Sequence, residues 1–198
     1  MQRRIGLTGG IASGKSSVGR LLEARGWPVL DADRFAREAL APGQPATKDV
    51  LQRYGAAVGN STGLNRAALG RIVFHNASER RWLEALIHPV VRDQMQLNLN
   101  ALKQEPVVVL MIPLLFEAGL TGLCSEIWVV SCSEEQQIAR MRQRDGLSEA
   151  DARARLAAQW PLARKQALAD LVINNTGGHE QLEEELCRCG RQQYRFDK

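Results

Sequence analysis

Several features are scarce or missing in this chain of 198 residues. Aromatic residues make up only 5% of it, and no apolar run approaches the roughly 18 residues that a membrane-spanning helix needs. The apolar stretch near the N-terminus is short and is interrupted by glycines and Lys15, which is not the pattern of a secretory signal peptide. We therefore expect a globular protein with neither a signal peptide nor a membrane partner.

The four cysteines show no zinc-binding spacing. Cys187 and Cys189 form a single C-x-C pair, and Cys124 and Cys132 stand apart from it. Such cysteines are typical of buried or idle thiols in a reducing compartment. We expect a cytoplasmic protein.

The charge is mixed, with a net charge of +4. A positive balance is compatible with nucleic-acid binding, but a polyphosphate pocket lined with arginines produces it as well. The scarcity of aromatic residues, the lack of a basic amphipathic tail and the clustering of arginines between 140 and 164 argue against a nucleic-acid-binding regulator. We expect no nucleic-acid partner.

What the chain does contain, at residues 9–16, is the complete phosphate-loop pattern G-x-x-x-x-G-K-[ST]. Glycines let consecutive backbone amides turn toward an oxyanion, and the helix expected next adds the positive end of its dipole. Lys15 can bring its charge to the β- and γ-phosphates, and the Ser16 hydroxyl can bind Mg²⁺. A strand is expected at 4–7 and a helix that stops at Gly26, so the context indicates a nucleoside triphosphate.

Two carboxylates follow the second expected strand, at residues 28–30. The strand ends on Asp31-Ala32-Asp33, and the carboxyl ends of parallel strands meet at the edge where ligands bind. Asp33 can serve a reaction, or it can belong to the start of a helix that begins here. We favour a functional role, because two carboxylates beside a phosphate loop are unfavourable unless a cation or a proton uses them.

Residues 41–105 predict helices rather than another strand–helix unit, with a polar loop at 55–63 and a helix that Asn65 can cap. Their longest apolar stripe, from Trp82 to Leu102, has the spacing of a packed helix. Pro89 predicts a kink or a break near His88. On the residues alone, His88 is more typical of a packed or capping histidine, whereas Arg92, one turn later, can offer a charge to a phosphate.

The clearest strand, residues 107–112, is apolar on both faces and so expected inside a parallel sheet. In many phosphate-loop ATPases such a strand ends in a magnesium-binding Asp, whereas here Pro-Leu-Leu-Phe-Glu follows at 113–117. That difference disfavours motor-like and AAA-like ATPases, and the lack of an Asn-Lys-x-Asp motif disfavours GTPases. Glu117 stays open between a site residue and a solvated loop acid.

An arginine-rich helical hairpin is expected between a fourth strand at 127–130 and a fifth at 170–173. Its first helix is expected over roughly 133–144, and Ser148-x-x-Asp151 predicts the start of the next. Phosphoryl-transfer enzymes need cations that close over the triphosphate and exclude water. Arg140 and Arg144 share one helical face, which suits that task, and we expect most other arginines here to be solvated. The turn after the fifth strand, at 174–178, is a place where a base can bind.

The order and content of several segments resemble the dephospho-CoA kinase family, which carries out the last step of coenzyme A synthesis. The matching segments are 7–16, 31–33, 86–89, 113–117, 136–145 and 159–175. Asp-Ala-Asp, His-Pro and Pro-Leu-Leu-Phe-Glu are far more specific than the phosphate loop. Two places depart from the family pattern: Ala12 stands where relatives often have Gly, and Trp160-Pro161 is unusual.

The resemblance implies an α/β fold of the phosphate-loop NTPase type, with a five-stranded parallel sheet flanked by helices. Its nucleotide-binding core would comprise residues 1–40, 106–133 and 166–198. A helical insertion, 41–105, would bind the coenzyme A precursor, and a helical lid would occupy 134–165.

The resemblance also implies a reaction: transfer of the γ-phosphoryl group of ATP, with Mg²⁺, to the ribose 3′-hydroxyl of dephospho-CoA. Asp33 would accept the hydroxyl proton, and we place His88, Arg92 and Glu117 with it on the acceptor side. Arg140 would be the lid cation, and Asn175 would lie near adenine. The residues expected to bind the nucleotide are Gly10, Ile11, Ala12, Ser13, Gly14, Lys15, Ser16, Arg140 and Asn175, with Lys15, Arg140 and Asp33 catalytic and Ser16 reaching the metal.

A nucleoside or nucleoside-monophosphate kinase of the same phosphate-loop class is the alternative, because a core, an insertion and a lid fit that activity too.

Overall fold

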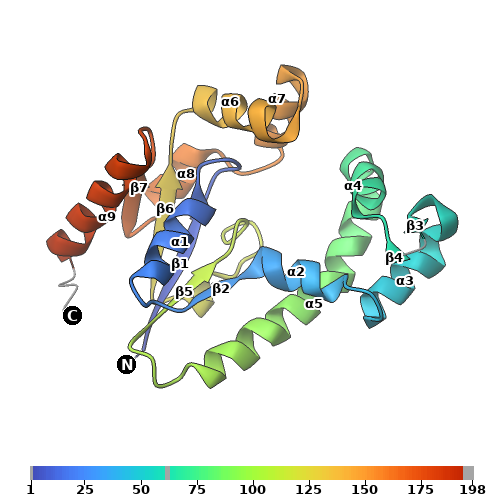
Figure 1. The fold of residues 1–198 in the computed structure, drawn as a ribbon, viewed down its shortest axis with the longest axis horizontal. Coiled ribbons are helices and arrows are strands. Elements are labelled where there is room, and N and C mark those ends of the chain that lie inside the picture. Colours follow the sequence, from blue (N-terminus) through green and yellow to red (C-terminus); the bar gives the residue numbers. More distant parts are fainter. Residues whose placement is uncertain (1, 61–62, 194–198) are drawn as a thin grey trace. The chain divides into compact units, whose positions relative to one another are not determined.

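A five-stranded sheet forms the centre of the first of two compact units in the computed structural model, which describes residues 2–60 and 63–193. We call this first unit, Met1–Leu30 with Leu102–Lys198, the core unit. Its strand order is β2-β5-β1-β6-β7, and β1 pairs in parallel with β5 and β6, as β6 does with β7 (Figure 1). The strands are β1 (Arg3–Gly9), β2 (Val29–Asp31), β5 (Val107–Met111), β6 (Glu126–Ser131) and β7 (Leu171–Asn174). All five expected strands are therefore confirmed.

Apolar side chains of the strands are buried in the core unit, in part beneath helices. Every residue of β5 is buried, as expected for a strand that lies between two others in a parallel sheet. Helices α1 (Lys15–Ala24) and α9 (His179–Gln193) contribute leucines to the same core cluster as the strands. Gly26, with φ of +83°, follows the end of α1, which confirms the expected stop.

Three helices lie between β6 and β7: α6 (Glu134–Asp145), α7 (Glu149–Ala157) and α8 (Leu162–Ala167). Ser133 and Gln136 form a reciprocal capping box at the start of α6. The Ser148 hydroxyl accepts a hydrogen bond from the Asp151 amide at the start of α7, so the helix start that the sequence predicts there is confirmed. A short 3-10 helix, η2 (Thr121–Leu123), precedes β6.

The second unit, Asp31–Ala101, is helical, and we call it the helical unit. Its elements are α2 (Ala32–Ala39), α3 (Pro45–Tyr54), η1 (Gly55–Ala57), β3 (Gly59–Asn60), β4 (Gly63–Leu64), α4 (Arg66–His75) and α5 (Ala77–Ala101). Helix α2 groups with the helices expected for the insertion. Asn65 caps α4 as predicted, since its Oδ1 accepts from the Ala68 amide at 3.0 Å. The loop expected at 55–63 contains η1 and β3 and leads into β4, whose Leu64 pairs with Gly59. Its residues 61–62 lie outside the described residues.

Helix α5 runs without interruption through Pro89, so the helix does not break near His88, and a kink there stays a prediction. A proline inside a helix removes one hydrogen bond, to the carbonyl four residues earlier. Both Ala85 and Pro89 are exposed, so water can satisfy that carbonyl and the helix can continue.

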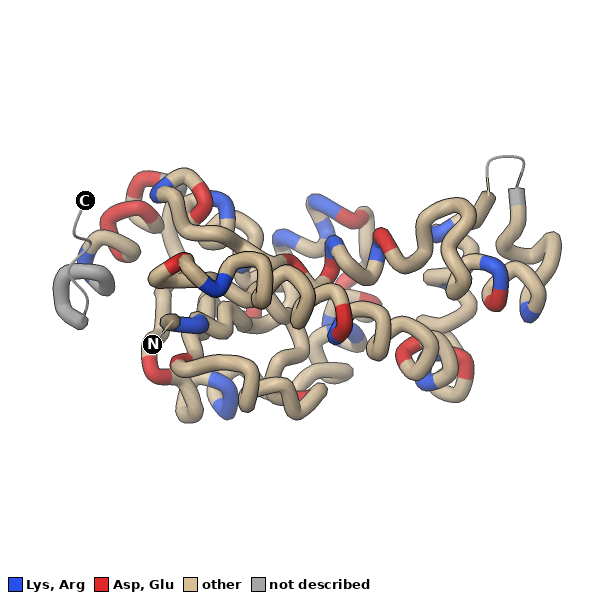
Figure 2. Tube along the Cα trace, turned by 90° about the horizontal axis from the view of Figure 1, so that it is seen from below, with Lys and Arg blue, Asp and Glu red and all other residues tan. Residues whose placement is uncertain are grey.

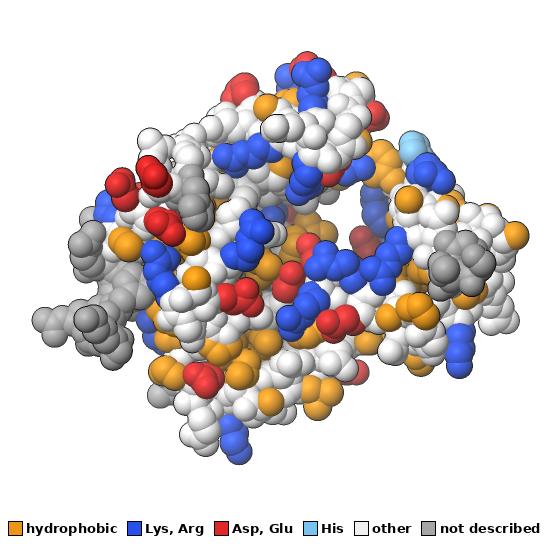
Figure 3. Space-filling view, in the orientation of Figure 1, with side chains coloured by type: hydrophobic (Ala, Val, Ile, Leu, Met, Phe, Trp, Pro, Cys, Tyr) orange, Lys and Arg blue, Asp and Glu red, His pale blue; other side chains and the backbone are white. Residues whose placement is uncertain are grey.

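Charged residues of both signs are dispersed along the chain. Figure 2 shows acidic and basic positions interspersed along the trace, and Figure 3 shows side chains of both signs on one face. In the part of the chain that the structure describes, no helix is both long and apolar enough to span a bilayer.

Candidate active site

The phosphate loop connects β1 to α1, and its glycines are required by the chain's close approaches. Gly14 has φ of +98°, and a Cβ there would collide with the side-chain amide of Asn175. A Cβ on Gly9 would collide with the Val130 carbonyl oxygen. The loop therefore fits against the ends of β6 and β7 only with glycine at these two positions.

Polar groups of the loop suit an anion. Lys15 Nζ donates to the Gly10 carbonyl at 3.0 Å, so the ammonium lies against the start of the loop. The amides of Gly14 and Ser16 donate to no other group among the described residues. Ser16 is exposed in the first turn of α1, where backbone amides and the helix dipole attract phosphate.

Arg140 and Asn175, both expected at the nucleotide, meet at the phosphate loop. One guanidinium nitrogen of Arg140 lies 3.3 Å from the carbonyl oxygens of both Ala12 and Ser13, and the other donates to the Asn175 carbonyl at 2.9 Å. The Asn175 side chain donates to the Ser13 carbonyl at 2.8 Å. The structure thus brings the expected cation and the expected adenine contact to one loop.

The charges of Lys15 and Arg140 also converge on Cys132, just after β6. Burial raises the pKa of the Cys132 thiol, and the positive charges of Arg140 and Lys15 oppose that rise. Arg144 does not share this position: its side chain is 64% exposed and pairs with Asp145 at 2.8 Å. Of the two arginines on the predicted face, only Arg140 is directed at the loop.

Two glutamines hold the Ile11 peptide, and sequence reasoning gave neither of them a role. Gln137 Nε2 donates to the Ile11 carbonyl at 2.6 Å, and the Ile11 amide donates to Gln159 Oε1 at 3.0 Å. Ile11 and Ala12 also pack against a small apolar cluster of α6 and α7. Both glutamines lie in segments that match the family pattern, 136–145 and 159–175, but that match assigns no contact to either of them.

Ala12, the position that departs from the family pattern, has a left-handed backbone with φ of +55°. An L-residue in this region is strained by about 1–2 kcal/mol, whereas glycine is not. Its methyl group is half-buried beside the α6–α7 cluster. Alanine at this position therefore combines a strained backbone with a small packing contact.

We expect Ala12→Gly to be at least as stable as the parent chain. The substitution relieves about 1–2 kcal/mol of backbone strain. It also loses a half-buried methyl group and gives the unfolded chain more freedom, and these two effects together cost about 1 kcal/mol. The gain therefore equals or exceeds the loss. Ala154→Gly, at an exposed site within α7, should instead lose about 0.5–1 kcal/mol. Thermal unfolding of both variants measures the difference, and an equal fall in melting temperature would contradict the strain at Ala12.

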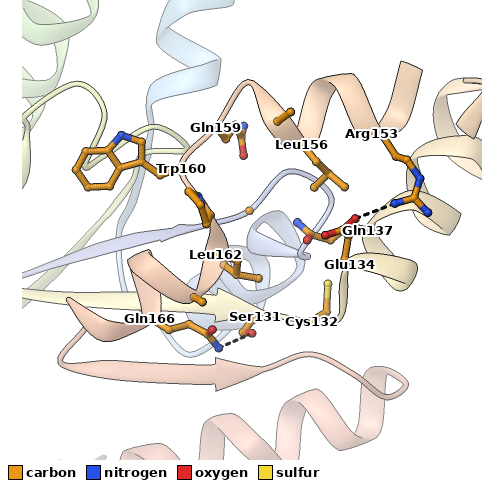
Figure 4. A pocket seen from close by; sticks show the side chains of 14 residues that line it. Ser131, Cys132, Glu134, Gln137, Arg153, Leu156, Gln159, Trp160, Leu162 and Gln166 are labelled. Atoms are coloured by element: carbon orange, nitrogen blue, oxygen red, sulfur yellow. Dashed lines mark hydrogen bonds and ion pairs between the residues drawn. The ribbon is translucent and has the colours of Figure 1, made fainter. Parts of the chain in front are cut away.

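A cavity of 570 Å³ lies beside the loop, between the end of β6 and helices α6, α7 and α8. Its lining includes Gly10, Cys132, Gln137, Leu156, Gln159 and Trp160. Figure 4 shows that residues from all these elements face the cavity. It also shows the hydrogen bond that the Gln166 side chain donates to the Ser131 hydroxyl. The lining mixes amide and apolar side chains, and the volume lies within the range of small-molecule sites.

Glu117 is not a solvated loop acid. Its side chain is only 16% exposed and pairs with Lys165 at 2.7 Å. Its Oε1 also accepts from the Trp160 amide at 3.1 Å. The interpretation of Glu117 as a solvated loop acid is therefore wrong.

The other acceptor-side candidates belong to the helical unit. Asp31 is the N-cap of α2, since its Oδ1 accepts a hydrogen bond from the Asp33 amide at 2.9 Å. Asp33 lies in the first turn of the helix and is exposed. His88 and Arg92 are exposed one turn apart on α5. His88 lies within the helix and on its surface, so it is neither packed nor capping.

The comparisons with known proteins agree with one another. Residues 3–181 match the family model described as dephospho-CoA kinase. A protein of Parasynechococcus marenigrum named dephospho-CoA kinase is 66% identical over 190 residues, covering 96% of each chain.

Solved structures extend the likeness to the fold. The crystal structure of TT1252 from Thermus thermophilus has a TM-score of 0.80 and 37% identity, covering 97% of this chain and 98% of its own. Dephospho-CoA kinase from Campylobacter jejuni has a TM-score of 0.70 and 26% identity, covering 97% of both chains. With its phosphate loop, its sheet order and these relatives, this chain belongs to the dephospho-CoA kinase family.

Proposed function

We propose that this protein transfers the γ-phosphoryl group of ATP to the ribose 3′-hydroxyl of dephospho-CoA, yielding coenzyme A. Family membership supports the substrate pair. The observation that carries the proposed chemistry is the arrangement of Lys15 and Arg140 on one phosphate loop, with Asn175 beside them. Phosphoryl transfer needs little covalent chemistry from a protein and depends mainly on positioning and charge neutralisation.

Each expected site residue has a role in the proposal. Gly10 to Ser16 hold the phosphates, with Lys15 at the β- and γ-phosphates and Asn175 near adenine. Arg140 neutralises charge that develops on the transferring group. Asp33 accepts the hydroxyl proton, and the exposed side chains of His88 and Arg92 contact the acceptor. Glu117 is assigned to the acceptor side with them.

Magnesium fits the donor set of the loop. Mg²⁺ binds through few protein ligands and keeps waters and substrate phosphates in its shell. Within the described residues no group of three acidic, histidine or cysteine side chains could hold a metal, whereas the exposed Ser16 hydroxyl is available in the first turn of α1. Ser16 would hold the ion against the phosphates, where Mg²⁺ supplies charge neutralisation.

The proposal places the enzyme in the cytoplasm with two small-molecule substrates and no nucleic-acid or membrane partner. Cys124, Cys132 and Cys187 are free thiols, which agrees with a reducing compartment.

A parallel assay of acceptors tests the function. Mg-ATP is incubated with dephospho-CoA, shikimate, nucleosides and nucleoside monophosphates in separate reactions, and ADP release is measured. We expect turnover with dephospho-CoA. Turnover of a nucleoside or a nucleoside monophosphate with none of dephospho-CoA would establish the alternative kinase activity instead.

The arginine assignment makes a separate prediction. Arg140→Ala should lower kcat by about 10²-fold, the scale of losing one preorganised charge contact. Arg153→Ala should stay near the parent rate, because Arg153 is 56% exposed and pairs with Glu134 and Glu149. Steady-state kinetics of the two variants compares them, and equal losses would mean that Arg140 has no special place at the triphosphate.

A further inference from the structure

We propose that Glu117 and Lys165 form a buried positioning pair that holds residues 158–165, the return segment, in place against the phosphate loop for phosphoryl transfer. This inference rests on the proposed function and adds a residue, Lys165, to which no role has been given above. The pair joins two segments that match the family pattern, because Glu117 ends the segment 113–117 and Lys165 lies within 159–175.

The pair itself is short and withdrawn from water. Lys165 Nζ lies 2.7 Å from Glu117 Oε1, and the Lys165 side chain is fully buried. Glu117 follows β5, whereas Lys165 lies in α8, so the contact connects two distant parts of the core unit. A charge in such a place requires a partner, and each of these residues depends on the other.

Glu117 also holds the return segment directly. The oxygen that pairs with Lys165 accepts the Trp160 amide at 3.1 Å. The Trp160 ring stacks on Phe116, with 6.1 Å between ring centroids and 10° between planes. The Arg164 guanidinium lies 3.5 Å from the centroid of the same ring. The unusual Trp160 thus fixes its segment on the residues that follow β5.

The return segment contacts the phosphate loop at the residue before Trp160. Gln159 precedes Trp160, and its Oε1 accepts the Ile11 amide at 3.0 Å. Gln159 and Trp160 both line the cavity that begins at Gly10. A displaced return segment would therefore move a loop contact and a cavity wall together.

Stability alone does not explain a pair of this kind. Removing two charges from water is unfavourable, and apolar side chains of similar volume commonly replace a buried pair without loss of stability. Moreover, Glu117 Oε2 is buried and has no hydrogen-bond partner among the described residues. The pair therefore leaves a buried polar atom unsatisfied, and we assign it the role of positioning the return segment.

The test removes the pair without leaving a charge buried. The double variant Glu117→Leu with Lys165→Met keeps the volume filled and removes both the ion pair and the acceptor of the Trp160 amide. A second double variant, Glu117→Gln with Lys165→Met, removes the ion pair but keeps an acceptor for that amide. A matched control, Glu185→Gln with Arg188→Met, neutralises an ion pair at the surface of α9.

Three quantities are measured for each variant: the melting temperature, kcat for coenzyme A formation, and the coenzyme A formed per ADP released. We expect the Leu/Met variant to melt near the parent temperature, with kcat about tenfold lower, since displacement of reacting groups by about 1 Å costs up to 10²-fold. Less coenzyme A should form per ADP, because a displaced segment admits water to the site. The Gln/Met variant should lie between it and the parent, and the control should match the parent.

Two results would overturn the inference. Parental kcat and parental coenzyme A per ADP in the Gln/Met variant would show that the pair places nothing needed for transfer, whether or not the Leu/Met variant folds. A fall in melting temperature with the yield per ADP unchanged would show a structural role alone. Failure of the proposed function is a separate outcome, because the parent chain would then form no coenzyme A at all.

Discussion

Replacing Asp33 by Asn is expected to lower kcat by about 10²-fold or more, the scale of general-base catalysis. The attacking hydroxyl must lose a proton, and a carboxylate within hydrogen-bond reach can accept it late in the transfer. Asparagine keeps the shape of the side chain and removes its negative charge and basicity. Steady-state kinetics with dephospho-CoA, together with ATP binding, measures the effect, and ATP binding should change little.

The structure sharpens this test because it separates the two aspartates. Asp31 caps α2, so removal of the cap by Asp31→Ala should cost about 1 kcal/mol of stability, and Asp31→Asn should restore most of it. Asp33→Asn removes a negative charge from the first turn of α2, and a charge at a helix N-terminus contributes about 0.3–1 kcal/mol. A near-parental rate for Asp33→Asn would remove Asp33 from the reaction.

Lys15→Ala is the second variant for which a large loss is expected. Its ammonium should interact most strongly as charge develops on the transferring phosphoryl group, so its removal should lower kcat by about 10²-fold or more. The melting temperature should change little, because Lys15 is half-buried in a loop–helix junction and contributes no apolar core. Steady-state kinetics and thermal unfolding are measured on the same preparation.

A matched control for Lys15→Ala is Lys103→Ala, which removes an exposed lysine just after α5. The control should retain the parental rate, because Lys103 is exposed and lies outside the phosphate loop. The net charge of the chain falls equally in both variants, so a difference in rate reports the position of Lys15. A Lys15→Ala variant with parental turnover would exclude the phosphate loop from the mechanism.

The elements near the phosphate loop were predictable because their signals are local. The glycines, the strand before them and the helix after them fix β1, the loop and α1 through turn geometry and periodicity alone. Ser148 and Asn65 marked two helix starts in the same way, since a cap acts within three residues of itself. Such features depend on neighbouring residues, which the sequence displays directly.

The remaining contacts depend on residues distant in the chain. Nothing near Gln159 indicates that it meets Ile11, and nothing near Lys165 indicates that it is buried against Glu117. The helix does not break at Pro89 for a related reason, because the local effect of the proline is offset by exposure to water. Tertiary packing decides these cases, and periodicity carries no information about it.

The carbonyl oxygens around Arg140 have a consequence for the thermodynamics of nucleotide binding. A free arginine side chain has about 2 kcal/mol of rotamer entropy to lose when it is immobilised. Contacts with Ala12, Ser13 and Asn175 already restrict that guanidinium, so much of this loss occurs when the chain folds. ATP binding should then involve an exchange of oxygen partners around an ordered cation, with a smaller entropic penalty than the ordering of a mobile one.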